Sequence, residues 1–201
     1  ALVADYLGPQ DWLHLHYRDK ALLLARGLPI AEFFRSLLAT GSSHSAGRQM
    51  SAHFSARELH VASMVGPVGN NALHAVGNAQ AVKYHPDAPV VVCCVGDGTT
   101  QQGEFLEAVA EAVRSEAPVV FVVQNNRWSI STSTPGQTFF DLPGGPADSL
   151  FGLPIRRVDG VDLSATRAAF EAAVTDTRAK RSPTLLLLDV ERLSDHTNAD
   201  D

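Results

Sequence analysis

Apolar runs rich in β-branched residues alternate with helix-periodic segments along this chain, and this alternation restricts its fold more than any other feature. The segments VVVCCVG at 90–96 and PVVFVVQNN at 118–126 are almost continuously apolar, as in strands covered on both faces. Between them, 103–117 repeats apolar residues at helical spacing. The same analysis predicts a strand at 153–160, a helix at 162–180 and a strand at 182–192. Strands joined by crossover helices predict an α/β fold, a parallel sheet flanked by helices.

The amino-terminal part of the chain is predicted to be helical around a polar loop. Helices are expected at 29–40, which Pro29 begins, and at 66–85, a segment rich in Gly, Ala and Asn. Between them, 41–60 is expected to form an ordered loop, and 133–152 and 194–201 are expected to be loops as well. Without repeats or a low-complexity linker, we predict a single α/β domain over 1–201.

Composition excludes several classes of protein. A hydrophobic content of 45% supports a packed core, and a net charge of −6 argues against a nucleic-acid partner, which requires a basic surface. No apolar run reaches membrane-spanning length, and the start of the sequence lacks a signal-peptide pattern. The only cysteines, Cys93 and Cys94, are adjacent in a predicted strand and point to opposite faces, so we expect two buried thiols in a reducing compartment.

One carboxylate occupies a conspicuous position in the stretch CCVGDGTTQQGEF. Asp97 stands between two glycines where a strand ends, and Asn126 ends the next strand along the chain. Ligands of open parallel sheets bind at the carboxyl ends of the strands, so both residues are expected at one edge. Carboxylate, amide and backbone carbonyl oxygens suit Mg²⁺. The glycines, followed by Thr99 and then by a helix start, suit a diphosphate. The alternative interpretation is plain turn chemistry, because Asp-Gly and Asn-Asn are common in turns.

The segment GDGTTQQGEFLEAVAEAVRSEAPVVFVVQNNRWSISTST resembles the thiamine-diphosphate motif of 2-oxo acid dehydrogenase E1 components, in particular their α subunit or α-like half. HYRDKALLLARGLP, GRQMSAHFS, MVGPVGNNALHAVGNA and ERLSDHTNADD also resemble segments of this family, in the family's order. The resemblance covers nearly the whole chain. It implies a thiamine-diphosphate-binding fold and the cofactors thiamine diphosphate and Mg²⁺.

The resemblance also implies roles for individual residues. The metal ligands would be Asp97, Asn126 and the backbone carbonyl of Trp128. The other residues that would contact the cofactor are Tyr17, Arg18, Gly66, Val68, Gly98, Thr99 and His196. Of these, His196 matches the family's loop histidine near the reacting carbon. His196 is the expected catalytic residue, and His60 is a second candidate.

From the sequence alone, some of these residues can also be interpreted as having no functional role. Arg18 can be an ordinary surface ion-pair partner, and Trp128 can be part of the core. The chain also departs from the family. Val65-Gly66 replaces a Ser-Ser pair, which puts a potassium site in doubt, and Arg127-Trp128 replaces Gly-Tyr.

The resemblance implies oxidative decarboxylation of a 2-oxo acid, with branched-chain acids favoured over pyruvate, and acyl transfer to a lipoylated E2 acyltransferase. The catalytic glutamate of the family has no candidate here, so a β subunit or β-like half is expected to supply it, and the chain is expected to be part of a longer one. Acetoin dehydrogenase, a transketolase-like half-enzyme and a non-catalytic scaffold are alternatives. The expected compartment is the cytoplasm, or the mitochondrial matrix in a eukaryote.

Overall fold

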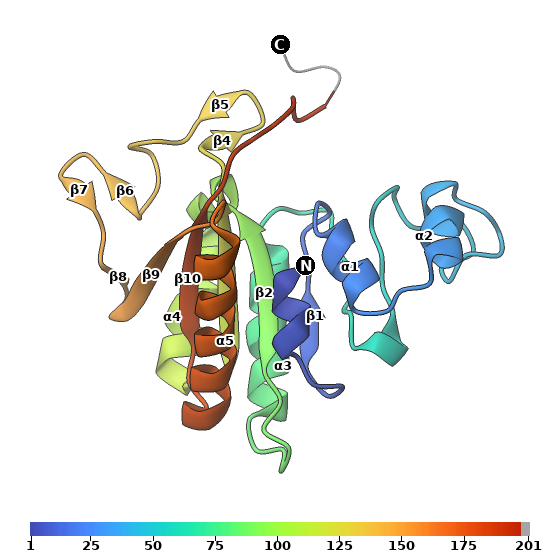
Figure 1. The fold of residues 1–201 in the computed structure, drawn as a ribbon, viewed down its shortest axis with the longest axis horizontal. Coiled ribbons are helices and arrows are strands. Elements are labelled where there is room, and N and C mark those ends of the chain that lie inside the picture. The colour runs from blue at the N-terminus through green and yellow to red at the C-terminus, as the bar shows by residue number, and fades with distance from the viewer. Residues whose placement is uncertain (198–201) are drawn as a thin grey trace.

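The computed structural model describes residues 1–197, in which a six-stranded sheet forms the centre (Figure 1). The strands lie in the order β1-β2-β3-β10-β9-β8, with parallel pairing except between β8 and β9. Their bounds are β1 Trp12–His14, β2 Val91–Gly96, β3 Val119–Asn125, β8 Ser149–Leu150, β9 Leu153–Asp159 and β10 Thr184–Asp189. The predicted parallel sheet and the four predicted strands are therefore confirmed.

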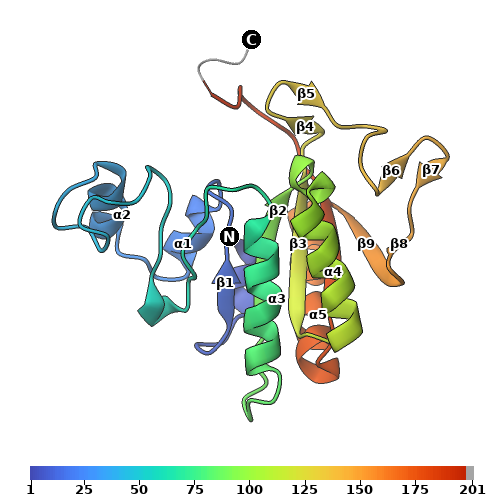
Figure 2. The ribbon, with the colours of Figure 1, turned by 180° about the vertical axis from the view of Figure 1, so that it is seen from behind.

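Helices cover both faces of the sheet. In Figure 1, α5 and the 3₁₀ helix η1 lie in front of the strands with α1 at one side, and Figure 2 shows α3 and α4 on the opposite face. The helix α2 and its loops lie beyond the β1 edge. The bounds are η1 Leu2–Tyr6, α1 Lys20–Ala25, α2 Ile30–Leu37, α3 Asn70–Val82, α4 Gly103–Ser115 and α5 Leu163–Lys180.

Alternation along β2 divides the core between the two layers. Val92 and Cys94 pack with the cluster under α1 and α5, whereas Cys93 and Val95 pack with the cluster under α3 and α4. The two thiols are free and buried on opposite faces, as expected, and burial raises the pKa of both. Both thiols are therefore chemically inert, and each acts as a small apolar side chain.

Helix starts follow local chemistry. The side chain of Asp162 accepts hydrogen bonds from the N–H groups of Ser164 and Ala165 at 2.8 and 3.1 Å, so it caps α5 as predicted. The predicted helix 66–85 is too long, because α3 begins only at Asn70. Gly69 precedes it with φ +92°, a conformation that keeps 66–69 out of the helix.

The strand β1 was not predicted, and it forms the edge of the sheet beside β2. Its entry is fixed by Asp11, which is 1% exposed and accepts from the N–H of Val90 at 2.7 Å. Arg178 of α5 donates two hydrogen bonds to the same carboxylate, at 3.0 and 2.7 Å. This buried ion pair joins the edge strand to the helix that crosses the sheet.

After Ser133, which ends β5, the predicted loop 133–152 contains only the short hairpin β6–β7 (Asp141–Leu142 and Gly145–Pro146) and the two-residue strand β8. Just before it, β4 (Trp128–Ser129) and β5 (Thr132–Ser133) form another hairpin above the sheet (Figure 1). Of the loop predicted at 194–201, residues 198–201 lie outside the described part.

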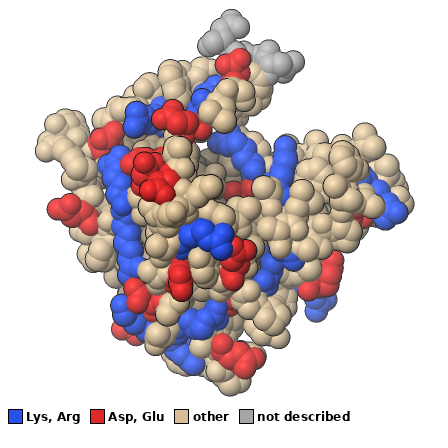
Figure 3. Space-filling model, in the orientation of Figure 1, with Lys and Arg blue, Asp and Glu red and all other residues tan. Residues whose placement is uncertain are grey.

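Acidic and basic side chains are interspersed on the face seen in Figure 3. None of the helices described within 1–197 combines the length and apolarity that a bilayer crossing needs.

Candidate functional site

The carboxyl ends of β1, β2 and β3 meet at one edge of the sheet. Gly96 pairs with Gln124, and the N–H of Asp97 donates to the carbonyl of Gln124 at 3.3 Å, so Asp97 and Asn126 follow neighbouring strand ends as expected. A cavity of about 250 Å³ opens at this edge. The predicted site residues that line it are Tyr17, Arg18, Val68, Asp97, Gly98, Thr99, Trp128 and His196. Residues from both ends of the sequence therefore converge on one hollow.

Asp97 is a buried carboxylate at the floor of the cavity, with an exposed fraction of 1%. Its Oδ2 accepts a hydrogen bond of 2.6 Å from the hydroxyl of Thr134, and its backbone carbonyl accepts from Thr100. Burial raises the pKa of Asp97, because the charged carboxylate loses hydration that the hydrogen bonds from Thr134 and from nearby backbone N–H groups only partly replace. A cation bound beside it would relieve that cost.

Gly98 begins the 3₁₀ turn η3 (Gly98–Gln101), and the helix α4 starts at Gly103, where the helix at 103–117 was predicted to begin. A Cβ at Gly98 would overlap the side chain of Ser129 in the β4 strand. Thr99, which follows, is 6% exposed. The glycine therefore permits the close approach of the hairpin to the turn after β2.

Asn126 and Trp128 lie in the turn that leads from β3 into the hairpin. Oδ1 of Asn126 accepts from the N–H of Trp128 at 3.0 Å, and the intervening Arg127 has φ +65°. An amide oxygen has two lone pairs, so this turn leaves one acceptor site on Asn126. Trp128 is 42% exposed and its ring lies 5.7 Å from the guanidinium of Arg192, which excludes the interpretation of Trp128 as a plain core residue.

Tyr17, Arg18 and His196 form one hydrogen-bonded cluster. Nη1 of Arg18 lies 2.8 Å from the Tyr17 hydroxyl and 3.0 Å from Nδ1 of His196, and Nε2 of His196 lies 3.1 Å from the same hydroxyl. A guanidinium only donates, so Nδ1 accepts and the ring proton belongs on Nε2. Within residues 1–197 Arg18 makes no ion pair, which does not fit the surface ion-pair interpretation.

Two residues that support this cluster had not been predicted. His16 lines the cavity, and burial, with the charges of Arg18 and two histidines, lowers its pKa to about 3, so the ring is neutral. Asp19 accepts from the N–H of His16 at 2.8 Å and from Nε2 of Gln124 at 2.6 Å. These bonds fix the turn that presents Tyr17 and Arg18 to the end of β3. The only signal in the sequence was an aspartate shortly after the histidine.

The structure does not bring every candidate into the cavity. His60 stacks on Trp12 with ring centroids 4.6 Å apart, and Trp12 pairs with Val91 at the opposite end of β2. Six residues separate Val91 from Asp97, about 20 Å along a strand. The catalytic role of His60 stays a prediction that this position does not favour. By contrast, the ring of His53 lies 6.5 Å from that of Tyr17.

Gly66 lies in the loop before α3, and a Cβ there would meet the sulfur of Met50 at 3.7 Å. It does not line the cavity as described, whereas Val68 does with an exposed fraction of 58%. Of the two residues expected to meet a cofactor ring, only Val68 faces the hollow.

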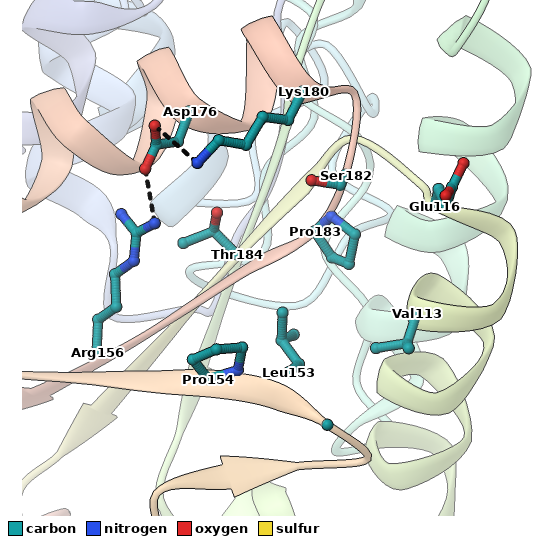
Figure 4. Close-up of a pocket in the computed structure, with 11 residues that line it drawn as sticks. Val113, Glu116, Leu153, Pro154, Arg156, Asp176, Lys180, Ser182, Pro183 and Thr184 are labelled. Atoms are coloured by element: carbon teal, nitrogen blue, oxygen red, sulfur yellow. Dashed lines mark hydrogen bonds and ion pairs between the residues drawn. The ribbon is translucent and has the colours of Figure 1, made fainter.

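A second hollow, of about 360 Å³, lies between α4, α5 and the first residues of β9 and β10 (Figure 4). Its charges are already paired, because Asp176 binds Arg156 at 2.6 Å and Lys180 at 3.2 Å. It lies at the amino ends of its strands, the edge where parallel sheets rarely bind ligands.

Among residues 1–197, no group of three or more His, Cys, Asp or Glu side chains is arranged to hold a metal ion. A metal at the first cavity would therefore depend on Asp97 together with amide and backbone oxygens.

Comparison with known proteins identifies relatives that match this chain over nearly its full length. The family model described as Dehydrogenase E1 component matches residues 1–201. The chain is 36% identical over 198 residues to the 3-methyl-2-oxobutanoate dehydrogenase subunit alpha of Mycobacterium tuberculosis, covering 98% of this chain and 51% of that protein. It is 32% identical to 2-oxoisovalerate dehydrogenase subunit alpha 2 of Arabidopsis thaliana, covering 98% and 42%. It is 31% identical to the pyruvate dehydrogenase E1 component subunit alpha of Porphyra purpurea, covering 98% and 59%. The chain thus spans about half the length of these relatives.

Solved structures show the same fold at low identity. The transketolase of Campylobacter jejuni superimposes with a TM-score of 0.64 at 18% identity, covering 94% of this chain and 32% of that one. The transketolase of Leishmania mexicana gives a TM-score of 0.60 at 19% identity, covering 92% and 29%.

Proposed function

Because the chain belongs to the dehydrogenase E1 component family, we propose that it is the α subunit or α-like half of a 2-oxo acid dehydrogenase that uses thiamine diphosphate and Mg²⁺. The observation that carries the proposal is the buried carboxylate of Asp97 at the cavity where Arg18 and His196 also gather. Thiamine diphosphate, when bound, supplies a carbon nucleophile that adds to a 2-oxo acid and allows carbon dioxide to leave.

The residues at the strand ends fit a hard divalent cation. Asp97 would give a carboxylate oxygen, Asn126 its remaining amide acceptor site and Trp128 its backbone carbonyl. Mg²⁺ prefers oxygen ligands and usually keeps one or two carboxylates, with phosphates and water completing the shell. Burial raises the pKa of Asp97 although the charge of Arg18 acts in the opposite direction, and a cation bound beside the carboxylate would offset the lost hydration further.

The other lining residues fit a diphosphate and an attached ring. Arg18 would donate to phosphate oxygens with its guanidinium, and Tyr17 orients that guanidinium through the 2.8 Å hydrogen bond. Gly98 and Thr99 would meet the diphosphate at the turn after β2, where backbone N–H groups begin a 3₁₀ helix. Val68, which is exposed and apolar, would pack against a ring, with Gly66 in the same loop.

His196 is proposed as the catalytic residue of this chain. Its Nε2 proton points toward the Tyr17 hydroxyl when Nδ1 accepts from Arg18. An imidazole in this tautomer that exchanges the Tyr17 hydroxyl for a substrate oxygen can donate to the negative charge that develops there, or can pass a proton. Neutral His16 beside it adds no competing positive charge.

A partner is needed to complete this site. Of the described side chains that line the cavity, Asp97 is the only carboxylate, and it is assigned to the metal. We therefore propose that a β subunit or β-like half supplies the catalytic glutamate. A lipoylated E2 acyltransferase would accept the acyl group. Two relatives are named for branched-chain acids and one for pyruvate, so a branched-chain 2-oxo acid is the proposed substrate. The proposed compartment is the mitochondrial matrix or a bacterial cytoplasm.

The test is a calorimetric titration of thiamine diphosphate with Mg²⁺ into the complete protein with its β half, repeated with EDTA. Saturable binding that EDTA abolishes is expected, and Asp97→Ala should remove it. Asp176→Ala is the matched control, because Asp176 lies in the other hollow and should leave the affinity unchanged. Unchanged affinity in Asp97→Ala would refute the metal assignment, and no binding by the wild type would favour a scaffold.

The proposed role of His196 has its own test. His196→Ala should lower turnover by about 10²- to 10⁴-fold, the usual contribution of a positioned acid or base. The calorimetric affinity for thiamine diphosphate should change much less, because the metal and diphosphate contacts stay. Full turnover in this variant would exclude a catalytic role.

A further inference from the structure

The hydroxyl of Thr134 lies against the carboxylate that is proposed to bind the metal. Oγ1 of Thr134 donates to Oδ2 of Asp97 at 2.6 Å, across 37 positions of the chain. Both side chains are buried, with exposed fractions of 6% and 1%. A hydrogen bond of this length between a hydroxyl and a carboxylate is charge-assisted, so it holds the acceptor firmly.

The backbone of Thr134 is fixed by the hairpin that precedes it. Its N–H donates to the carbonyl of Arg127 at 3.0 Å, and its carbonyl accepts from the N–H of Gln137 at 2.9 Å. Arg127 precedes Trp128 at the start of β4, and Thr134 follows the end of β5. One hairpin therefore delivers both the Trp128 carbonyl and the Thr134 hydroxyl to the surroundings of Asp97.

We propose that Thr134 is a positioning residue for the metal site: held by the β4–β5 hairpin, it fixes one carboxylate oxygen of Asp97 in the orientation that metal binding needs. The inference rests on the proposed function of the cavity. A neutral donor is suited to this task, because it orients the carboxylate without cancelling the charge that attracts a cation. A lysine or arginine at this position would compete with the metal.

The same loop offers a matched control. Thr138 is 2% exposed, and its hydroxyl has no hydrogen-bond partner among the described residues. Thr138→Val and Thr134→Val thus make the same change of shape in the same loop. Only the second variant removes a hydrogen bond to Asp97.

The experiment uses the complete protein with its β half and measures by calorimetry the Mg²⁺ concentration that half-saturates thiamine diphosphate binding. Thr134→Val should raise that concentration about 10- to 100-fold, the usual effect of losing a group that orients a metal ligand. Thr134→Ser, which keeps the hydroxyl, and Thr138→Val should both stay near the wild-type value.

The outcomes separate this inference from the proposed function. If the wild type binds the cofactor with Mg²⁺ and Thr134→Val shows the same metal dependence, the inference is overturned while the proposed function stands. Equal losses in Thr134→Val and Thr138→Val would also overturn it, since packing of the loop would then explain both. A wild type without metal-dependent binding would overturn both proposals. If Thr134→Val does not fold, Thr134→Ala takes its place, with the same outcomes.

Discussion

Replacing His14 by glutamine should make the protein more resistant to acid. His14 is 6% exposed at the end of β1, and Nδ2 of Asn78 in α3 lies 3.2 Å from its Nε2. An amide N–H can donate only to an unprotonated ring nitrogen, so this contact requires neutral His14. Burial, with a smaller contribution from the charge of His74, lowers the pKa of His14 from 6.5 to about 4. Glutamine keeps an acceptor for Asn78 but does not titrate.

The sign and size of the effect follow from linkage between protonation and folding. Below about pH 6.5 the unfolded chain protonates this histidine while the folded chain does not, so folding stability falls as pH drops toward the folded pKa. At about pH 5 the difference amounts to about 2 kcal/mol, and at about pH 7.5 it is close to zero. His16 has a lowered pKa as well and adds its own loss, but that loss is common to both proteins.

The assay is hydrogen exchange followed by mass spectrometry on peptides from β1 and β2, at several urea concentrations and at both pH values. Wild type should lose about 2 kcal/mol more of its unfolding free energy between the two pH values than His14→Gln does. An equal loss in both proteins would show that His14 is not buried in the neutral form, and the edge-strand packing described above would be wrong.

Two further predictions concern the hairpin and the edge strand. Gly98→Ala should weaken cofactor binding, because its Cβ would overlap Ser129; Ser129→Gly in the same chain should restore part of the affinity, and additive effects of the two changes would refute the steric explanation. Arg178→Met should cost about 3 kcal/mol in urea unfolding, the lower end of the range for a buried pair, because it leaves the buried Asp11 carboxylate with only the N–H donors of Gly8 and Val90. The control Arg114→Met, which breaks an exposed ion pair, should change the free energy of unfolding far less, and similar costs for the two would contradict the argument.

The elements that were predicted well from the sequence are those whose own residues show by their polarity which faces are buried. The strands β2, β3 and β10 are covered on both faces, so nearly all their residues are apolar. Asp97 and Asn126 could be assigned to one edge because parallel strands present their carboxyl ends together. The family resemblance then supplied Tyr17 and His196, which no local pattern would have joined.

The elements that were missed depend on tertiary contacts. The strand β1 has three residues, and the buried His14 made its segment read as polar. Thr134 carried no signal, because a threonine in a polar loop reveals its partner only when the loop is folded. His60 was placed near the site on resemblance, yet its ring stacks on Trp12 at the other end of the strand. Local periodicity contains none of this information.

The contact of Tyr17 and Arg18 with His196 has a consequence for how fast the protein is degraded in a cell. These residues are separated by 179 and 178 positions, so the contact closes a loop that includes almost every element of the sheet. A partly folded chain lacks the cavity altogether, and a ligand of the cavity therefore binds the native state alone and stabilises it by mass action. Scarcity of the ligand would shorten the survival of the protein, since unliganded molecules open and are degraded more often. The abundance of this chain should then follow the supply of its cofactor.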